Sequence, residues 1–262
     1  MRNNKILDNI IIGIVLVFLF LPIFVLILFS FNTSQLNITF EGFTLKWYGE
    51  LFKNTTLLLA LKNTLIVAIV STVVSTVIGT ISAYGLYKYD FPLKKIVNRL
   101  LYIPVVIPEI VLGISLLAIY TVFKLELGMT TLILAHISFS IPFVIINVRN
   151  ILEQMDGNLI LAANDLGASK LKTFLYVTIP SLMPGILSGA ELAFTLSLDD
   201  VVISYFTAGP GSNTLPLQIY SIIKTGVTPD VNALITLMLL VIFIVLTVSV
   251  LINLRKMKKV SN

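Results

Sequence analysis

The chain has 262 residues, of which 57% are hydrophobic and only 12% are charged, and its formal net charge is +5. Soluble domains have roughly 45–50% apolar and about 25% charged residues, so the composition excludes an ordinary water-soluble fold and predicts a protein of the lipid bilayer. Basic residues flank the apolar runs, so orientation in the membrane explains the positive charge and we expect no nucleic acid partner. The lack of cysteine excludes disulfides and thiolate metal sites. The single histidine, His136, is expected to be a packed helix residue, and no metal site is predicted.

Six stretches are long and apolar enough, or nearly so, to supply the roughly 20 residues that a helix needs to cross the hydrocarbon core. They are Ile10–Phe31, Leu57–Tyr87, Leu100–Phe123, Met129–Val148, Leu182–Phe206 and Val231–Leu254. The first resembles a signal peptide, but its apolar run exceeds the usual length of about 7–15 residues and no small-residue cleavage site follows, so we expect a retained anchor. The predicted fold class is all-α, a polytopic membrane bundle of about six transmembrane helices that forms one domain over residues 1–262.

Basic residues predict the orientation of the bundle, because the cytoplasmic loops of membrane proteins carry an excess of lysine and arginine. When both termini are placed in the cytoplasm, 13 of the 18 basic residues fall on the inner side. These 13 are Arg2, Lys5, Lys88, Lys94, Lys95, Arg99, Arg149, Lys170, Lys172, Arg255, Lys256, Lys258 and Lys259. The sequence therefore predicts a multi-pass membrane protein with cytoplasmic N- and C-termini.

The cytoplasmic connection Asn150–Ser181 is about 30 residues long and is expected to be ordered. Ile160–Leu166 has a helical composition, and Gly167 is a suitable C-terminal cap because it tolerates a positive φ. Ser169 can then cap a second short helix, Lys170–Thr178, which carries an apolar stripe. Two such helices bury too little apolar surface to be stable alone. The pattern therefore predicts a compact knob that docks on a cytoplasmic partner, and an ordinary ordered loop is the alternative.

The knob resembles the EAA signature of ABC-importer permeases, which is Glu-Ala-Ala-x-x-x-Gly and, after nine further residues, Ile-x-Leu-Pro. The matching positions hold Ala162, Ala163, Gly167, Val177, Ile179 and Pro180, and Leu161 stands where the family has glutamate. The resemblance implies a type I ABC-importer permease fold, in which the knob, Asp165 included, sits in a groove of an ATP-binding subunit. Leu161 then implies docking by packing at that position and not through a carboxylate. Pro180 is expected to end the knob before the next span.

A second resemblance covers the end of the fifth span and the residues that follow it. These segments are Ser197-Leu198-Asp199-Asp200-Val201-Val202-Ile203-Ser204, Gly209-Pro210-Gly211, Leu215-Pro216-Leu217, Ile219-Tyr220-Ser221 and Pro229-Asp230-Val231-Asn232-Ala233-Leu234. They resemble spermidine/putrescine importer permeases of the PotC type. The resemblance implies a polyamine transport subunit of the bacterial inner membrane, without catalytic residues. It also implies a heterodimer with a PotB-type permease, a PotA-type ATP-binding subunit dimer and an external PotD-type polyamine-binding protein.

The chain itself is expected to bind no cofactor. It contains no Gly-x-x-x-x-Gly-Lys-Ser/Thr sequence, the loop that cradles nucleotide phosphates, so ATP and Mg²⁺ must be bound by the partner ATPase.

Four carboxylates are candidates for a cation path or gate: Glu109, Glu191, Asp199 and Asp200. A charged side chain at mid-bilayer costs roughly 2.5–3.5 kcal/mol on insertion scales, so such residues usually face a cavity or a partner. No lysine or arginine lies inside their spans to balance them. This arrangement suits a polyamine, which carries two to four positive charges. The alternative is that some of the four lie in interfacial water or pair with basic residues of a second subunit.

Other functions stay open at this point. An ABC permease could carry iron, thiamine, sulfate or molybdate. A secondary transporter would usually show two related halves, and no internal repeat is evident here. An intramembrane enzyme would need a nucleophile with a base or a metal cluster, and a chain with no cysteine and one histidine offers neither in its sequence pattern.

Overall fold

The computed structural model describes residues 5–35, 39–223 and 228–260, and within these the side chains of residues 8–35, 39–223, 228–244 and 247. Over these ranges the chain is helical, and the β-structure consists of one isolated antiparallel bridge between Asn32 and Phe43. The chain divides into two compact units, residues 1–58 with 219–262 and residues 59–218, which are described separately. The all-α prediction is confirmed for the described residues, whereas the single permease domain over residues 1–262 stays a prediction.

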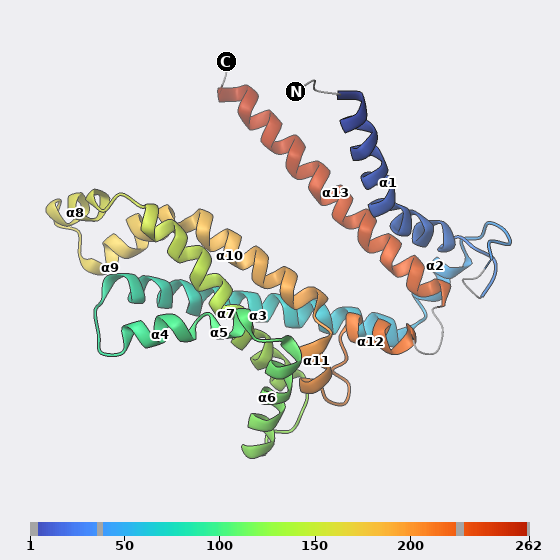
Figure 1. Ribbon diagram of the computed structural model, residues 1–262, viewed down its shortest axis with the longest axis horizontal. Helices are drawn as coiled ribbons and strands as arrows, with labels where there is room; N and C mark the ends of the chain where they lie inside the picture. Colours follow the sequence, from blue (N-terminus) through green and yellow to red (C-terminus); the bar gives the residue numbers. More distant parts are fainter. Residues whose placement is uncertain (1–4, 36–38, 224–227, 261–262) are drawn as a thin grey trace. The chain divides into compact units, whose positions relative to one another are not determined.

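The first unit contains α1 (Lys5–Phe29), the short helix α2 (Lys46–Leu51) and α13 (Pro229–Val260) (Figure 1). Both α1 and α2 contact α13. The indole Nε1 of Trp47 on α2 donates to the carbonyl oxygen of Asn32 over 2.6 Å, which fixes the segment between α1 and α2. The most apolar stretch of α1 has none of its residues buried within the chain, as expected of a helix whose sides face lipid or another subunit.

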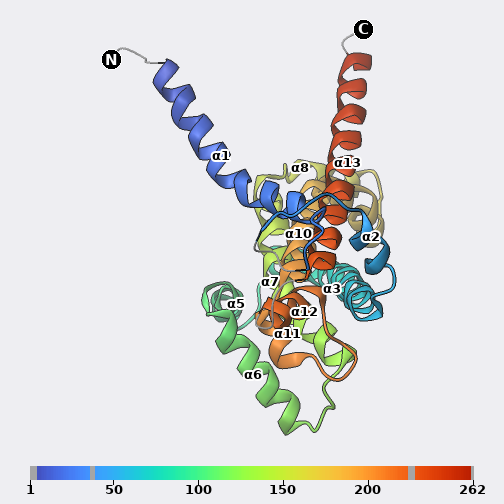
Figure 2. The ribbon, with the colours of Figure 1, turned by 90° about the vertical axis from the view of Figure 1, so that its right-hand side faces the viewer.

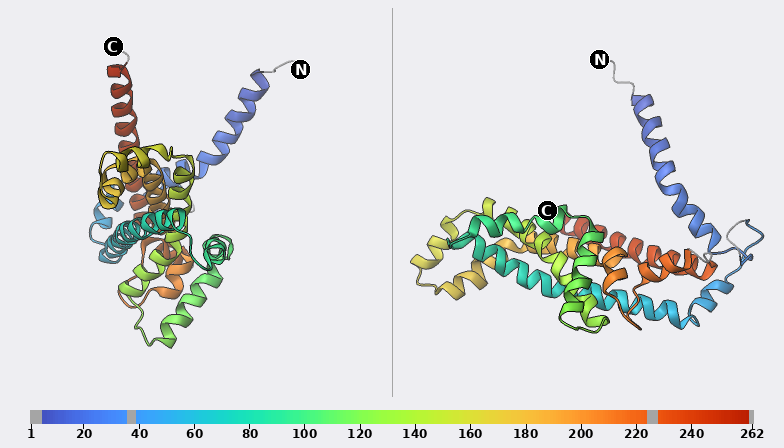
Figure 3. Two further views of the ribbon diagram at one scale, coloured as in Figure 1. Left: turned by 90° about the vertical axis from the view of Figure 1, so that its left-hand side faces the viewer. Right: turned by 60° about the horizontal axis from the view of Figure 1, so that its bottom comes forward.

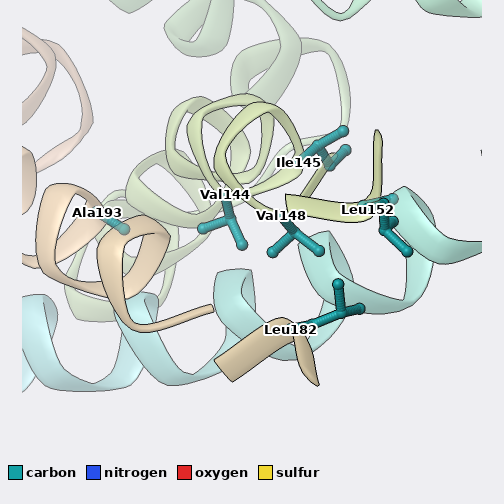
Figure 4. Packing of buried hydrophobic residues seen from close by; sticks show 7 residues of the cluster. Val144, Ile145, Val148, Leu152, Leu182 and Ala193 are labelled. Atoms are coloured by element: carbon teal, nitrogen blue, oxygen red, sulfur yellow. The ribbon is translucent and has the colours of Figure 1, made fainter. Parts of the chain in front are cut away.

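The second unit is built around three long helices that lie along one another: α3 (Thr55–Lys88, whose first four residues belong to the other unit), α7 (Met129–Gln154) and α10 (Ile179–Asp199) (Figures 1 and 4). Their facing sides form one apolar cluster. It consists of Ala83, Val144, Ile145, Val148, Leu152, Leu182 and Ala193. Figure 4 shows Val144 and Val148 of α7 pointing to the side where Leu182 of α10 lies, whereas Ile145 points away from α10.

Small residues at every fourth position let α10 approach α7 closely. Gly185, Gly189, Ala193 and Ser197 are all buried on one side of α10. A Cβ added at Gly185 would lie 2.7 Å from a side-chain carbon of Ile151, and one at Gly189 would lie 3.1 Å from the backbone of α7. Stripes of small residues at this spacing are a common basis of helix association in membranes, because backbone-to-backbone approach replaces the missing hydrophobic drive.

The third predicted span is not one straight helix. The structure places α4 (Lys94–Leu100) and α5 (Ile103–Val106) before α6 (Glu109–Val122), with a bend of 111° between the two parts (Figure 2). Pro108 lacks an amide hydrogen and disfavours a helical conformation at Ile107, which is extended with ψ of 137°. A run of apolar composition thus contains a sharp break that its hydropathy does not reveal.

The fifth predicted span is also divided. Helix α10 ends at Asp199, the backbone of Asp200 is extended, and a separate helix α11 (Val202–Thr207) follows, with α12 (Leu215–Ile223) after a loop. By length and composition, four helical stretches of the described chain can cross a membrane, or five if the bent pair counts as one span. The sixth prediction falls in α13, whose described apolar part is Pro229–Ile244.

Candidate functional site

The knob consists of helix α8 (Asn158–Asp165) and the helix α9 (Lys170–Thr173), which continues into a π-helical segment η1 (Phe174–Thr178). In Figure 3 they are the yellow and gold coils at one end of their unit. Gly167 joins them with φ of 81°, as predicted. The amide of Gly167 donates to the carbonyl oxygen of Asn164 over 2.9 Å, and that of Ala168 donates to Ala163 over 3.0 Å. These two bonds form a Schellman motif, which ends α8 and satisfies its last carbonyls.

Side chains fasten the second half of the knob. The Oγ of Ser169 accepts from the amide of Lys172 over 3.4 Å, which confirms the predicted cap. The hydroxyl of Thr173 donates to the side-chain oxygen of Asn164 over 3.3 Å and so ties α9 to α8. The ring of Phe174 lies 4.7 Å from that of Tyr84 on α3, between centroids. The knob is therefore an ordered unit attached to the long helices.

Apolar side chains of the knob are unusually exposed. Leu166 has 89% and Leu161 has 60% of its surface accessible. Leu159, Leu171, Leu175 and Tyr176 are exposed as well. Of the other residues of the signature, Ala162, Asp165, Gly167 and Pro180 are exposed, and Ala163, Val177 and Ile179 are half-buried. The predicted coupling residues thus lie on the knob and at the start of α10, and most of them are exposed.

The prediction that Pro180 separates the knob from the next span is wrong. The helix runs on from Lys170 through η1 to Asp199 as one apolar stretch of 30 residues. A proline inside an α-helix removes one backbone hydrogen bond. The π-helical segment just before Pro180 shifts the hydrogen-bonding pattern by one residue, and Pro180 falls in the first turn of α10, where its missing amide costs little.

A cavity of about 490 Å³ lies at the two helix breaks of the same unit. It is bounded by the α5–α6 bend, by α7 and by the joint between α10 and α11. Three carboxylates line it: Glu109, Asp199 and Asp200. The remaining lining residues are Pro104, Val105, Ile107, Pro108, Leu112, Phe139, Phe143, Leu196, Val201, Val202 and Ile203. Three of the four predicted carboxylates, from two distant parts of the sequence, therefore share one cavity with apolar and aromatic walls.

The three carboxylates are not equivalent. Glu109 and Asp199 are exposed, and neither has a basic side chain within 4 Å in the part of the chain that the structure describes. Asp200 is only 8% exposed. Its two oxygens accept from the amides of Ile203 over 3.0 Å and Ser204 over 2.7 Å, which caps the start of α11. Asp199 and Glu109 are thus free to meet a ligand, whereas Asp200 is engaged by the backbone.

Glu191 does not join this group. It is exposed on α10, eight residues before Asp199, and it does not line the cavity. Nothing in the geometry supports a role for it in a cation path.

His136 is the polar residue whose role the sequence did not reveal. It is fully buried on α7, as predicted for a packed histidine. Its Nδ1 lies 2.7 Å from the Oγ of Ser197, and its Nε2 lies 3.2 Å from the Oγ of Ser204 and 3.5 Å from Asp200. A lone histidine in an apolar span needs polar partners, and that need was the only signal available. It did not say which residues those partners are.

This Ser–His–Asp constellation is not an enzyme site. Ser197 is 2% exposed and does not line the cavity, so no substrate could reach its hydroxyl. Within the described residues, no group of three or more histidine, aspartate or glutamate side chains could hold a metal ion.

Comparisons with known proteins place these sites in context. The sequence profile described as "Binding-protein-dependent transport system inner membrane component" matches residues 75–259. The chain is 41% identical to the spermidine/putrescine transport system permease protein PotC of Escherichia coli K12, over 92% of this chain and 91% of the relative. The Haemophilus influenzae protein of the same name is 38% identical, over 94% and 96% of the two chains. The putrescine transport system permease protein PotI of Escherichia coli K12 is 37% identical, over 85% and 82%.

Two solved structures share the fold. A chain of a bacterial ABC transporter involved in import of the acidic polysaccharide alginate has a TM-score of 0.75 at 16% identity and covers 95% of this chain and 97% of its own. A chain of the MetNI methionine ABC transporter, in an inward-facing conformation, has a TM-score of 0.59 at 20% identity, over 78% and 93%. These matches confirm the predicted type I ABC-importer permease fold and carry no information on substrate.

Proposed function

Because this chain belongs to the family of inner-membrane components of binding-protein-dependent transport systems, we propose that it carries polyamines, spermidine and putrescine, across the membrane. One observation supports the proposal above all others: Glu109 and Asp199 line a single cavity without a basic partner among the described residues. Unbalanced carboxylates in a membrane protein usually face an ion path or a ligand. The relatives that are named for spermidine and putrescine give that ligand a chemical identity.

The walls of the cavity suit the same class of substrate. A polyamine alternates ammonium groups with short methylene chains, so it needs carboxylates and apolar contact side by side. The cavity offers both, with Phe139 and Phe143 beside the acidic residues, and aromatic faces attract cations. Its volume of about 490 Å³ lies within the usual range of roughly 300–1,000 Å³ for small-molecule sites.

The acidic lining of the cavity also helps to choose between polyamines and the other ABC-importer substrates considered above. Sulfate and molybdate are anions, and Glu109 and Asp199 would repel them. Iron and thiamine are cations, and the names of the relatives favour polyamines over both. Asp200 contributes negative charge to the cavity, while its hydrogen bonds to α11 leave direct contact with substrate to Asp199 and Glu109.

We propose further that the knob docks on a cytoplasmic ATP-binding subunit. Leu161 and Leu166 are exposed beside the Gly167 turn, and so much apolar surface on an ordered unit outside the hydrocarbon core needs a cover. ATP and Mg²⁺ would then be bound by that PotA-type subunit, and none by this chain. A PotB-type second permease and an external PotD-type binding protein complete the proposed importer, with both termini in the cytoplasm.

The proposal is tested by removing one charge from the cavity. Asp199→Asn keeps the shape of the side chain, and we expect uptake to fall at least tenfold. The estimate is conservative, because unit charges about 4 Å apart interact by roughly 4 kcal/mol at an effective dielectric near 20, and a third of that energy already changes a rate about tenfold. Spermidine, with three charges, should lose more than putrescine, with two.

The measurement is uptake of labelled spermidine and putrescine by cells that carry the complete importer, normalised to permease in the membrane. Glu191→Gln is the matched control, since it removes a carboxylate from the same helix outside the cavity, and its uptake should equal that of the parent. Unchanged uptake of both substrates in Asp199→Asn would refute a role of the cavity in transport.

A further inference from the structure

Four helices and one joint meet at the imidazole of His136. The ring comes from α7, Ser197 from α10 and Ser204 from α11. Ser71 of α3 joins the group, because its Oγ lies 3.2 Å from the Oγ of Ser197. The joint itself supplies Asp200, whose carboxylate lies 3.5 Å from the imidazole Nε2. Residues far apart in the sequence therefore converge where α10 stops and α11 starts.

The hydrogen-bonding capacity of these groups gives the network a direction. An ionised carboxylate can only accept, and Asp200 already accepts from the amide of Ser204. The neutral imidazole of His136 has one ring proton, and it therefore carries this proton on Nε2, which faces Asp200 and the hydroxyl of Ser204. The other ring nitrogen, Nδ1, accepts a hydrogen bond from the hydroxyl of Ser197. The hydroxyl of Ser197 on α10 thus donates to His136, and His136 on α7 in turn directs its ring proton toward the carboxylate of Asp200.

The joint borders the cavity on its other side. Asp200 lines the cavity, and the preceding residue, Asp199, presents its carboxylate there. Phe139, one turn after His136 on α7, lines it too, and its ring centroid lies 5.2 Å from that of the imidazole. His136 itself is buried behind this wall and is not among the lining residues. It can therefore influence the cavity only through the residues that it holds.

We propose that His136 is a positioning residue for transport, whose imidazole fixes the Asp200 joint and so presents Asp199 to the cavity. The inference rests on the proposed function for its effect on uptake, and on the structure alone for its effect on the joint. Packing does not require an imidazole, because an aliphatic side chain of similar volume would fill the same space. What an aliphatic side chain lacks is a donor toward Asp200, which would leave a buried carboxylate with fewer partners.

Two substitutions separate the donor from the volume. His136→Leu keeps an apolar body of similar size and removes both ring nitrogens. His136→Gln carries an amide NH₂ group at about the reach of the imidazole Nε2, so it can still donate to Asp200 and Ser204. Leu152→Ala, in the apolar cluster of the same helix, serves as a control that loosens packing without touching the joint.

The first measurement is amide hydrogen exchange of the complete importer in lipid nanodiscs. The amides of Ile203 and Ser204 are held by Asp200, so they report on the joint directly. We expect His136→Leu to speed their exchange about tenfold, His136→Gln to stay near the parent, and Leu152→Ala to leave residues 201–207 unchanged. Unchanged exchange in His136→Leu, or equal acceleration along all of α7 and α10, would overturn the proposal.

The second measurement is a double-mutant cycle on uptake. Asp199→Asn should cost about tenfold in the parent and less than about threefold in the His136→Leu background, where the charge is no longer held in place. The cost should remain about tenfold in the Leu152→Ala background. An equal tenfold cost in the His136→Leu background would overturn the positioning role in transport. No effect of Asp199→Asn in any background would overturn the proposed function, while the exchange experiment would still decide whether His136 holds the joint.

Discussion

The knob and the α10–α11 joint are both turns between helical segments of one unit, and they are held in opposite ways. The turn of the knob is closed by backbone bonds between residues at most five positions apart, and its side chains are exposed. The joint is held by a network of buried side chains, which are Ser71, His136, Ser197, Asp200 and Ser204. A turn of the first kind suits the role proposed for the knob, which is to present a surface to the ATP-binding subunit. A turn of the second kind sets the internal geometry of its own unit.

The comparison predicts that the backbone conformation of Gly167 is the most sensitive feature of the knob. Gly167→Val should reduce uptake more than about twentyfold and reduce recovery of the ATP-binding subunit in pull-downs, because valine strongly disfavours φ of 81°. Gly157→Val is the matched control in the same knob, since Gly157 has φ of −58° and open space around its Cβ. Normal uptake by a well-inserted Gly167→Val would remove the knob from the coupling mechanism.

The cavity differs from the knob in its charge, and its charge can be measured directly. The chain has no cysteine, so Val105→Cys places one thiol at the edge of the cavity. A cationic methanethiosulfonate should react with it about tenfold faster than an anionic one, after correction for their intrinsic rates. Adding Asp199→Asn should lower that ratio. A ratio near one in both backgrounds would contradict an acidic cavity.

Asp200 sharpens the comparison, because it is next to Asp199 and is expected to act differently. Asp200→Ala removes the cap of α11, which costs about 1 kcal/mol, and should lower the unfolding temperature by roughly 2–4 °C. Asp200→Asn should be milder, since asparagine also caps helices. Uptake of spermidine and putrescine should fall to the same extent in Asp200→Ala. A loss that grows with substrate charge would instead assign Asp200 to the path itself.

Leu161 should give the smallest effect. It is exposed on α8 and occupies the position of a glutamate in the family signature. Leu161→Glu should assemble with the ATP-binding subunit as the parent does, whereas Leu161→Lys should reduce recovery in pull-downs about threefold, or by under 1 kcal/mol. Equal recovery of both variants would show that this side chain does not touch the partner.

The same contrast explains which features could be predicted from the sequence. Gly167 and Ser169 act on neighbours within a few residues, so their roles as caps followed from residue type and spacing alone, and the structure confirms both. His136 acts on Ser197 and Ser204, which are 61 and 68 residues away. Such pairings depend on how the helices pack, and a single sequence contains no measure of that.

Breaks within apolar helices were the second feature that the sequence reading did not predict correctly. Hydropathy identified the segments of the bundle, but it averages over about 20 residues and so passed over the bend at Pro108. The prediction for Pro180 was wrong in the opposite sense, because a break was expected there and the helix continues. A proline usually ends a helix, and here the preceding π-helical segment accommodates it, a geometry for which the sequence carries no dependable sign.

The helical stretch from Lys170 to Asp199 has one end in the knob and the other at the cavity. At about 1.5 Å per residue its 30 residues span about 45 Å. A tilt of about 10° around its midpoint would move each end by about 4 Å in opposite directions. A small displacement imposed at the knob would then reach Asp199 through this one helical stretch, in which the π-helical segment, Pro180 and Pro184 are the points where it can bend. Bending of this helix would be the way in which part of that displacement is lost before it reaches Asp199.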